Sequence, residues 1–92
     1  MNDRLVGPVL ARGEAASAVM EAICGSNTGV EVVDRGAYLR VHRPDRCAVT
    51  RAAIEERLGR RFELPADLEA VMPSFRGVLE ITQDEVVWRW RA

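Results

Sequence analysis

Two pairs of short apolar segments, each pair joined by a tight turn, restrict the fold of this chain more than any other feature. Segments 30–33 and 37–42 flank the sequence DRG, and segments 77–82 and 85–90 flank the sequence QD. Turn-forming residues between alternating apolar segments are typical of β-hairpins. The chain is therefore predicted to contain two antiparallel hairpins.

A further strand-like segment, 5–10, contains Pro8. Because proline cannot donate a hydrogen bond to a neighbouring strand, this segment is predicted to be an edge strand or an extended arm. Residues 43–46, with the sequence RPDR, are predicted to form a turn, and residues 72–77 a loop.

Three helices are predicted. Apolar residues over 15–23 recur at helical spacing, and the sequence GSNTG stops that helix. Thr50 is suited to cap the N-terminus of a second helix, and Gly59 to end it. A short third helix begins near Pro65 and ends at Pro73.

The predicted order is β-α-β-β-α-α-β-β, which defines an α+β domain with antiparallel sheets, two main helices and a short third helix. At 92 residues the chain fits one domain spanning 1–92. A short flexible N-terminus of about residues 1–5 is expected to precede it.

Charge and hydropathy exclude several classes of protein. Fourteen acidic and 13 basic residues give a net charge of −1, and every basic residue is an arginine. Nucleic-acid binders usually carry a basic excess, so no nucleic-acid partner is expected. Neither a signal peptide nor an apolar run long enough to cross a membrane is visible, which predicts a soluble, cytoplasmic protein without a membrane partner.

The residues that could carry out chemistry are few. His42 is the only histidine, and Cys24 and Cys47 have neither zinc-ligand nor disulfide-framework spacing. Cys24 is expected to be a reduced, packed residue. A pair formed by either cysteine with His42 has no supporting motif, and no phosphate-binding or nucleophile motif is present. We therefore expect no catalytic residues, no metal site and no cofactor, and a function in binding.

Four blocks of sequence resemble a known family. They are VGPV at 6–9, VDRGAYLRV at 33–41, TRAAIEERLGRRF at 50–62, and the acidic helical segment that follows. In this order and spacing they resemble the effector proteins, also called coupling or regulatory proteins, of bacterial multicomponent diiron monooxygenases. The resemblance runs from about Val6 to Trp90, and the toluene-monooxygenase branch is the most similar.

The resemblance implies a cofactorless regulatory protein that docks on the α-subunit of a diiron hydroxylase. It would shift the helices near the metal site and couple NADH oxidation and O2 activation to hydroxylation or epoxidation, in interplay with a reductase or ferredoxin. The alternative is an unrelated small α+β protein that binds another protein or a ligand.

The segment MPSFRG at 72–77 matches the family loop that faces the hydroxylase. The resemblance implies that Phe75 is an apolar anchor, Ser74 a hydrogen-bonding group and Arg76 a charged contact, with Met72 and Pro73 in the same loop. The competing interpretation is that Phe75 closes the core.

The remaining partner-binding candidates also follow from the resemblance. Asn27 is either a helix stop or a contact, with contact favoured because the surrounding segment is polar. Tyr38 belongs either to the core or to the interface. The N-terminal arm adds Val6, Gly7, Pro8 and Val9, either as docking surface, as an edge strand, or as both.

Overall fold

The computed structural model describes residues 4–91, which contain seven strands and three helices. Their order is β1 (Leu5–Ala11), α1 (Glu14–Ser26), β2 (Glu31–Asp34), β3 (Tyr38–Pro44), β4 (Arg46–Thr50), α2 (Arg51–Leu58), α3 (Ala66–Val71), β5 (Ser74–Arg76), β6 (Val78–Ile81) and β7 (Glu85–Arg89). The predicted α+β class is confirmed, with both predicted hairpins present as β2–β3 and β6–β7.

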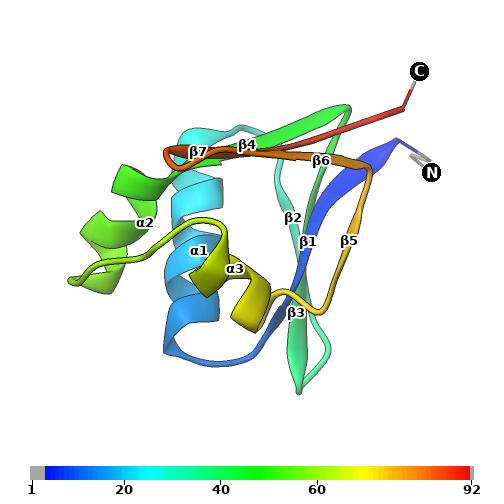
Figure 1. Ribbon diagram of the computed structural model, residues 1–92. Helices are drawn as coiled ribbons and strands as arrows, with labels where there is room; N and C mark the ends of the chain where they lie inside the picture. The colour runs from blue at the N-terminus through cyan, green and yellow to red at the C-terminus, as the bar shows by residue number, and fades with distance from the viewer. Residues whose placement is uncertain (1–3, 92) are drawn as a thin grey trace.

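The strands form two antiparallel sheets. One has four strands in the order β2-β3-β1-β5, and the other has three in the order β4-β7-β6. In Figure 1 the three-stranded sheet runs across one end of the four-stranded sheet, and the helices lie in the angle between them. One face of the four-stranded sheet therefore packs on helix while the other does not.

Two strands were not predicted, and they lie in segments expected to be a turn and a loop. β4 follows β3 directly because the turn is confined to Asp45, which adopts a left-handed conformation with φ 68°. β5 occupies the middle of the predicted 72–77 loop and pairs with β1, Pro8 lying opposite Phe75. Three residues are too few for an alternating pattern to identify a strand.

The prediction that residues 5–10 form an edge strand is wrong, because β1 lies between β3 and β5. The β1–β3 register pairs Val6 with Arg43 and Val9 with Arg40, and no pair is formed at Gly7 and Pro8 between them. An inner strand accommodates proline here because the ladder toward β3 is interrupted at that position. Of the flexible segment expected over 1–5, positions 1–3 lie outside the described residues, and Leu5 already belongs to β1.

The first helix ends within the segment GSNTG that was predicted to stop it, with Asn27 at its C-terminal cap. Ala16, Val19 and Ile23 are buried, as the helical stripe predicts, and the helix continues to Ser26. The prediction that Cys24 is a packed residue is wrong. Both cysteines are free, but Cys24 is exposed and only Cys47 is buried. The helical period turns position 24 away from the sheet although it follows directly after a buried isoleucine.

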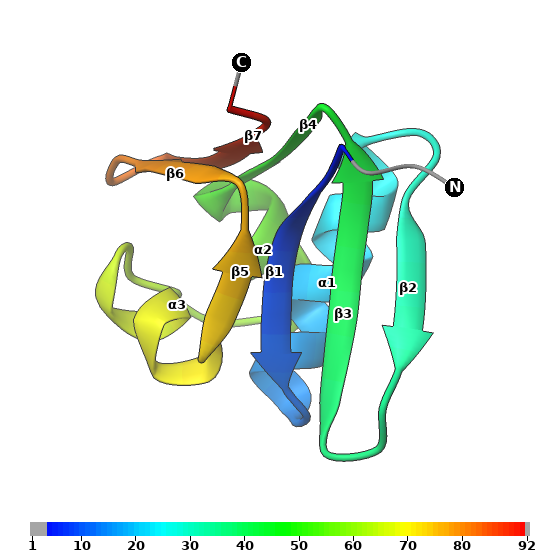
Figure 2. The ribbon, with the colours of Figure 1, turned by 90° about the vertical axis from the view of Figure 1, so that its right-hand side faces the viewer.

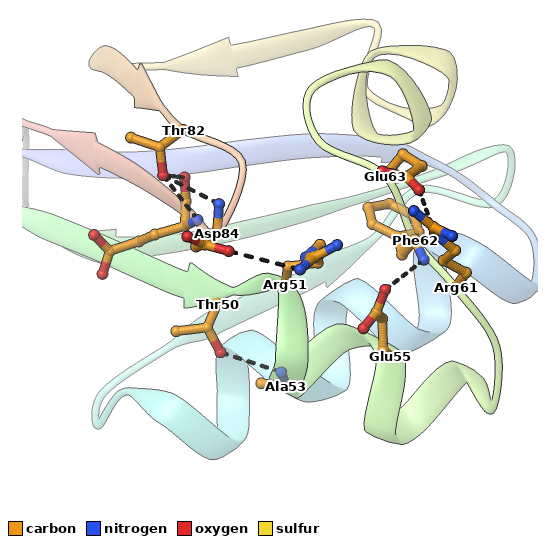
Figure 3. Close-up of polar contacts among 10 residues, drawn as sticks. Thr50, Arg51, Ala53, Glu55, Arg61, Phe62, Glu63, Thr82 and Asp84 are labelled. Atoms are coloured by element: carbon orange, nitrogen blue, oxygen red, sulfur yellow. Dashed lines mark hydrogen bonds and ion pairs between the residues drawn. The ribbon is translucent and has the colours of Figure 1, made fainter.

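Both predicted caps of α2 are present, and Figure 3 shows the one at its N-terminus. The Thr50 hydroxyl accepts a hydrogen bond from the Ala53 backbone N–H at 3.1 Å, and Gly59 ends the helix in the left-handed conformation. The Glu55 carboxylate accepts a hydrogen bond from the Phe62 backbone N–H at 2.9 Å, which fixes the segment leaving the helix. Phe62 is consequently held in the core, at 2% exposure.

One hydrophobic core fills the space between the sheets and the helices. The two sheets and all three helices contribute to it; its largest fully buried side chains are Trp88, Phe62, Leu10, Ile23, Ile54 and Leu68. Of the alternating residues predicted for the last strand, Val86 and Trp88 are core residues, while Trp90 packs at the margin.

Candidate partner-binding face

One face of the four-stranded sheet carries no other element of the described chain. In Figure 2, β5, β1, β3 and β2 face the viewer and the helices lie behind them. Side chains of a strand alternate between the two faces of its sheet. Val6 and Leu10 of β1 and Leu39 and Val41 of β3 are buried, so they point toward the helices.

The residues between these buried positions therefore point away from the helices. We call this surface the outer face; its residues are Gly7, Val9, Ala11, Glu31, Val33, Tyr38, Arg40, His42, Ser74 and Arg76. The strand registers arrange them in rows across the sheet. One row holds Arg76, Gly7, His42 and Glu31, and the next holds Ser74, Val9, Arg40 and Val33.

Gly7 is required at the centre of the first row. Its φ of +140° disfavours any other residue, and a β-carbon built there would lie 2.1 Å from the Val41 carbonyl oxygen. The same β-carbon would lie 3.2 Å from Cδ2 of His42. The missing side chain at position 7 thus leaves room for the His42 imidazole beside β1.

His42 is buried although it belongs to the outer face, with 3% of its surface exposed. Its Nε2 atom is buried and has no hydrogen-bond partner among the described residues. The pKa of His42 is lowered to about 4, mainly by burial and also by the positive charges of Arg40 and Arg76, while a hydrogen bond to the Gly7 backbone opposes the shift. The imidazole is therefore neutral near neutral pH.

Arg40 and Arg76 lie on either side of His42, from β3 and β5. Neither forms an ion pair within residues 4–91, whereas six other arginines do: Arg4, Arg12, Arg51, Arg60, Arg61 and Arg89. The outer face therefore carries two arginines outside ion pairs and one carboxylate, that of Glu31, on a protein whose net charge is −1.

Apolar side chains accompany these charges. Tyr38 on the outer face is 43% exposed. Phe75, 39% exposed, lies opposite Pro8 and therefore points to the other side of β5 from Ser74 and Arg76. Large aromatic side chains exposed beside arginines are the residue types enriched in protein–protein interfaces.

The structure divides the predicted partner-binding residues into accessible and buried ones. The accessible set, exposed or half-buried, is Val9, Tyr38, Pro73, Ser74, Phe75 and Arg76. Four other predicted residues are buried, which contradicts the prediction that their side chains contact the partner directly: Val6, Gly7, Pro8 and Met72. Val6 and Pro8 point into the core, and Met72 packs there at the end of α3.

Asn27 is also better explained by a structural role than by the contact we favoured. Its Nδ2 donates to the carbonyls of Ile23 and Ala48, both at 2.8 Å, and its Oδ1 accepts from the Ala48 N–H at 3.3 Å. These hydrogen bonds use its amide to join the end of α1 to β4.

Arg40 and His42 were missed as residues of this face. Tyr38, Arg40 and His42 alternate along β3 and therefore share a face, but the position of Arg40 and His42 beside Arg76 depends on β5, which was not predicted. Within residues 4–91, no group of three or more His, Cys, Asp or Glu side chains is placed to hold a metal ion. No helix in the described part of the chain is long and apolar enough to span a membrane.

Fold and surface define a small α+β protein with an uncovered sheet face suited to contact with another protein. The MmoB/DmpM family model matches residues 4–89, and the chain belongs to this family. The alkene monooxygenase system effector subunit of Xanthobacter autotrophicus (strain ATCC BAA-1158 / Py2) is 43% identical, over 100% of this chain and 92% of the relative.

Solved structures agree with the fold. A phenol hydroxylase–regulatory protein complex contains a chain with a TM-score of 0.84 and 23% identity, covering 95% of this chain and 99% of that one. The soluble methane monooxygenase regulatory protein B gives a TM-score of 0.73 and 22% identity, covering 99% of this chain and 68% of that one. The predicted family is confirmed, and the alternative of an unrelated domain is wrong. The relatives are named effector or regulatory proteins, so the chain is a regulatory rather than a catalytic member of its system.

Proposed function

We propose that this protein is the effector component of a multicomponent monooxygenase and docks on the α-subunit of its diiron hydroxylase through the outer face and β5. The observation that carries this proposal is the uncovered four-stranded sheet, on which accessible residues of three strands lie together: the half-buried Val9 and the exposed Tyr38, Ser74 and Arg76. The names of the relatives, an alkene monooxygenase effector subunit and a regulatory protein in complex with phenol hydroxylase, support the choice of partner.

The chemistry of the outer face suits a protein partner. Tyr38 offers a rigid aromatic surface, and Arg40 and Arg76 offer guanidinium groups that form no ion pair within residues 4–91. Arginine and tyrosine are the residues most often found as energetic hot spots. A carboxylate on the hydroxylase, placed against these arginines, would form charge-assisted hydrogen bonds and favour one docking orientation.

Docking regulates the hydroxylase if the effector binds one conformation of it more tightly than another. Shifting a two-state equilibrium from 1:99 to 99:1 requires about 5.5 kcal/mol of differential affinity. An interface of standard size, roughly 1,600 Å² in total, supplies this when a few anchoring side chains are well placed. In this way the protein would reposition helices around the metal site without contributing a reacting group.

Selective binding to one hydroxylase conformation would also allow the effector to couple electron transfer to O2 activation. A hydroxylase conformation selected by the effector would accept electrons from the reductase or ferredoxin and activate O2 for hydroxylation or epoxidation. Because coupling free energies are reciprocal, the redox or ligand state of the hydroxylase must change its affinity for the effector by the same factor. Affinity measured for the oxidised and the reduced hydroxylase should therefore differ.

The test is steady-state turnover by the hydroxylase and reductase of the same system, titrated with this protein. Product formed per NADH should rise and saturate near one effector per active site. Arg76→Glu, which reverses a charge on the outer face, should shift the titration to at least about tenfold higher concentration. Arg35→Glu, an equally charge-reversing change in the β2–β3 turn, should leave it unchanged.

A flat titration with an active hydroxylase would contradict the effector role. Equal effects of the Arg76 and Arg35 variants would leave the role intact but remove the outer face as the docking surface.

A further inference from the structure

A polar depression of about 380 Å³ lies at the C-terminal end of α1. Its lining residues are Gly25, Ser26, Asn27, Thr28, Arg43 and Arg46, none of which belongs to the outer face. The lining includes two guanidinium groups and no carboxylate. A ligand in this depression would therefore meet positive charge and hydrogen-bond donors.

Arg43 is held in place by the backbone. Its Nε donates to the Thr28 carbonyl and its Nη1 to the Arg46 carbonyl, both at 2.6 Å. Carbonyl groups orient the guanidinium but leave its unit charge uncompensated. An arginine fixed in this way binds an anion without first losing the entropy of a mobile side chain.

The wall between the two arginines and α1 is also rigid. The hydrogen bonds of Asn27 to Ile23 and Ala48 fasten the loop that leaves the helix. Ser26 and Thr28 on either side of Asn27 are exposed, and their hydroxyl groups have no partner within residues 4–91. Two further donors are thus available beside the guanidinium groups.

The local charges reinforce one another. Arg46 forms no ion pair in the described chain, and its acidic neighbour Asp45 pairs with Arg4. Burial raises the pKa of the Cys47 thiol to about 12, and the charges of Arg43 and Arg46 both oppose that rise, so both lie near the same buried sulfur. The C-terminus of α1 contributes only about half a negative charge, which the two arginines exceed.

A third guanidinium lies beside the same helix end, outside the residues that line the depression. A β-carbon at position 25 would be only 2.5 Å from Nη2 of Arg57, so the missing side chain of Gly25 gives Arg57 its place against the helix end. Arg57 likewise forms no ion pair among the described residues. Three arginines from β3, β4 and α2 thus converge on one helix terminus.

We propose that this depression is a binding site for the phosphate group of a small anionic ligand. The planar donors of arginine match the oxygens of phosphate in pairs, and the Ser26 and Thr28 hydroxyls supply donors for the remaining oxygens. The open shape admits a phosphate that is either free or attached to a larger group, as in a nucleotide. This site is independent of the docking surface proposed above.

The test is a titration of the isotope-labelled protein with inorganic phosphate, followed by NMR and compared with chloride at matched ionic strength. The backbone amides of Ser26, Thr28 and Arg46 should shift and saturate with phosphate alone. Arg46→Gln should weaken this binding at least about tenfold, and Arg46→Lys, which keeps the charge but loses the paired donors, should weaken it less. Arg35→Gln, an exposed arginine in the β2–β3 turn, is the matched control and should bind as the unaltered protein does.

Shifts that rise linearly, spread over many arginines and persist in Arg46→Gln would overturn the site. ADP and citrate distinguish the ligand classes: tighter binding of ADP than of phosphate identifies a nucleotide, equal binding identifies free phosphate, and tighter binding of citrate would overturn the assignment to phosphate. Spectra of the ligand-free variants verify that each is folded. Because no hydroxylase is present, the outcome does not depend on the effector role.

Discussion

The side chain of Asn27 and the backbone of Ala48 form a reciprocal pair of hydrogen bonds, Nδ2 to the carbonyl at 2.8 Å and the amide N–H to Oδ1 at 3.3 Å. Since the same Nδ2 also donates to the Ile23 carbonyl, one amide closes the last turn of α1 and attaches it to β4. A single side chain thus joins the first helix to the three-stranded sheet.

Asn27→Ala should lower the free energy of unfolding by about 2–3 kcal/mol, because it removes these hydrogen bonds and leaves partly buried backbone groups unpaired. Urea denaturation measures the loss. Thr28→Ala, an exposed neighbour, should change stability by less than about 0.5 kcal/mol. If folded Asn27→Ala binds the hydroxylase more weakly than Thr28→Ala does, Asn27 is also a contact.

Gly7→Ala should destabilise the protein by more than about 3 kcal/mol. A β-carbon at position 7 would lie 2.1 Å from a backbone oxygen, which cannot move aside as a flexible side chain can, and φ is +140°. Gly13→Ala is the matched control, since a β-carbon there meets nothing within 4 Å. Thermal unfolding of both variants gives the comparison, and similar midpoints would show that β1 can shift away from β3.

Acid should destabilise the protein through His42. The folded-state pKa of His42 is about 4, below its ordinary 6.5, so the unfolded chain takes up a proton that the folded chain excludes as pH falls through this interval. The contribution of neutral His42 to the free energy of unfolding is complete above pH 6.5. It declines by at most about 1.4 kcal/mol per pH unit down to about pH 4. Urea unfolding at pH 7 and pH 5 measures the decline.

His42→Phe is the control for that measurement, because it removes the titrating group and keeps a planar ring. Its stability should fall less than half as far between pH 7 and pH 5. Arg12 lowers the pKa of Asp34, so the stability that this carboxylate contributes is lost only below pH 3.8, outside the interval measured. An equal fall in the variant would assign the pH dependence to other groups.

Phe75→Ala should weaken hydroxylase binding by about 1–2 kcal/mol with little loss of stability, because the side chain is 39% exposed at the edge strand β5. Val32→Ala is the matched control: Val32 is 41% exposed at the opposite edge of the same sheet and lies outside the predicted docking set. Calorimetric titration with the hydroxylase gives both affinities. A Phe75 variant that binds normally and unfolds at lower denaturant concentration would make Phe75 a core residue.

Local patterns were enough to predict the longer elements. The helical stripe from Ala16 to Ile23, the capping residues Thr50 and Gly59, and the alternation around Tyr38 each depend on neighbours in the sequence. Both hairpins were predicted for the same reason, since their turns and strands are contiguous.

Long-range pairing could not be predicted in this way. β5 is a strand only because β1 lies beside it, and Pro8 lies in an inner strand only because the ladder to β3 is interrupted there. The burial of Met72 and the position of Arg40 and His42 beside Arg76 follow from those two pairings. The family resemblance predicts which segments take part in binding, and the register between strands decides which of their side chains reach the surface.

Gly77 is the single residue between β5 of one sheet and β6 of the other, with φ +101°, and a β-carbon there would lie 2.7 Å from both the Arg89 carbonyl oxygen and Val6 Cγ1. An inserted residue would have to displace either β5 along β1 or β6 along β7, and a displacement of one position exchanges the faces of a strand. At Gly36, by contrast, a β-carbon would meet nothing within 4 Å, so the turn there can lengthen into solvent. Proteins with this fold can therefore differ in the length of the β2–β3 turn. The connection between β5 and β6, where the two sheets meet, has to keep its length.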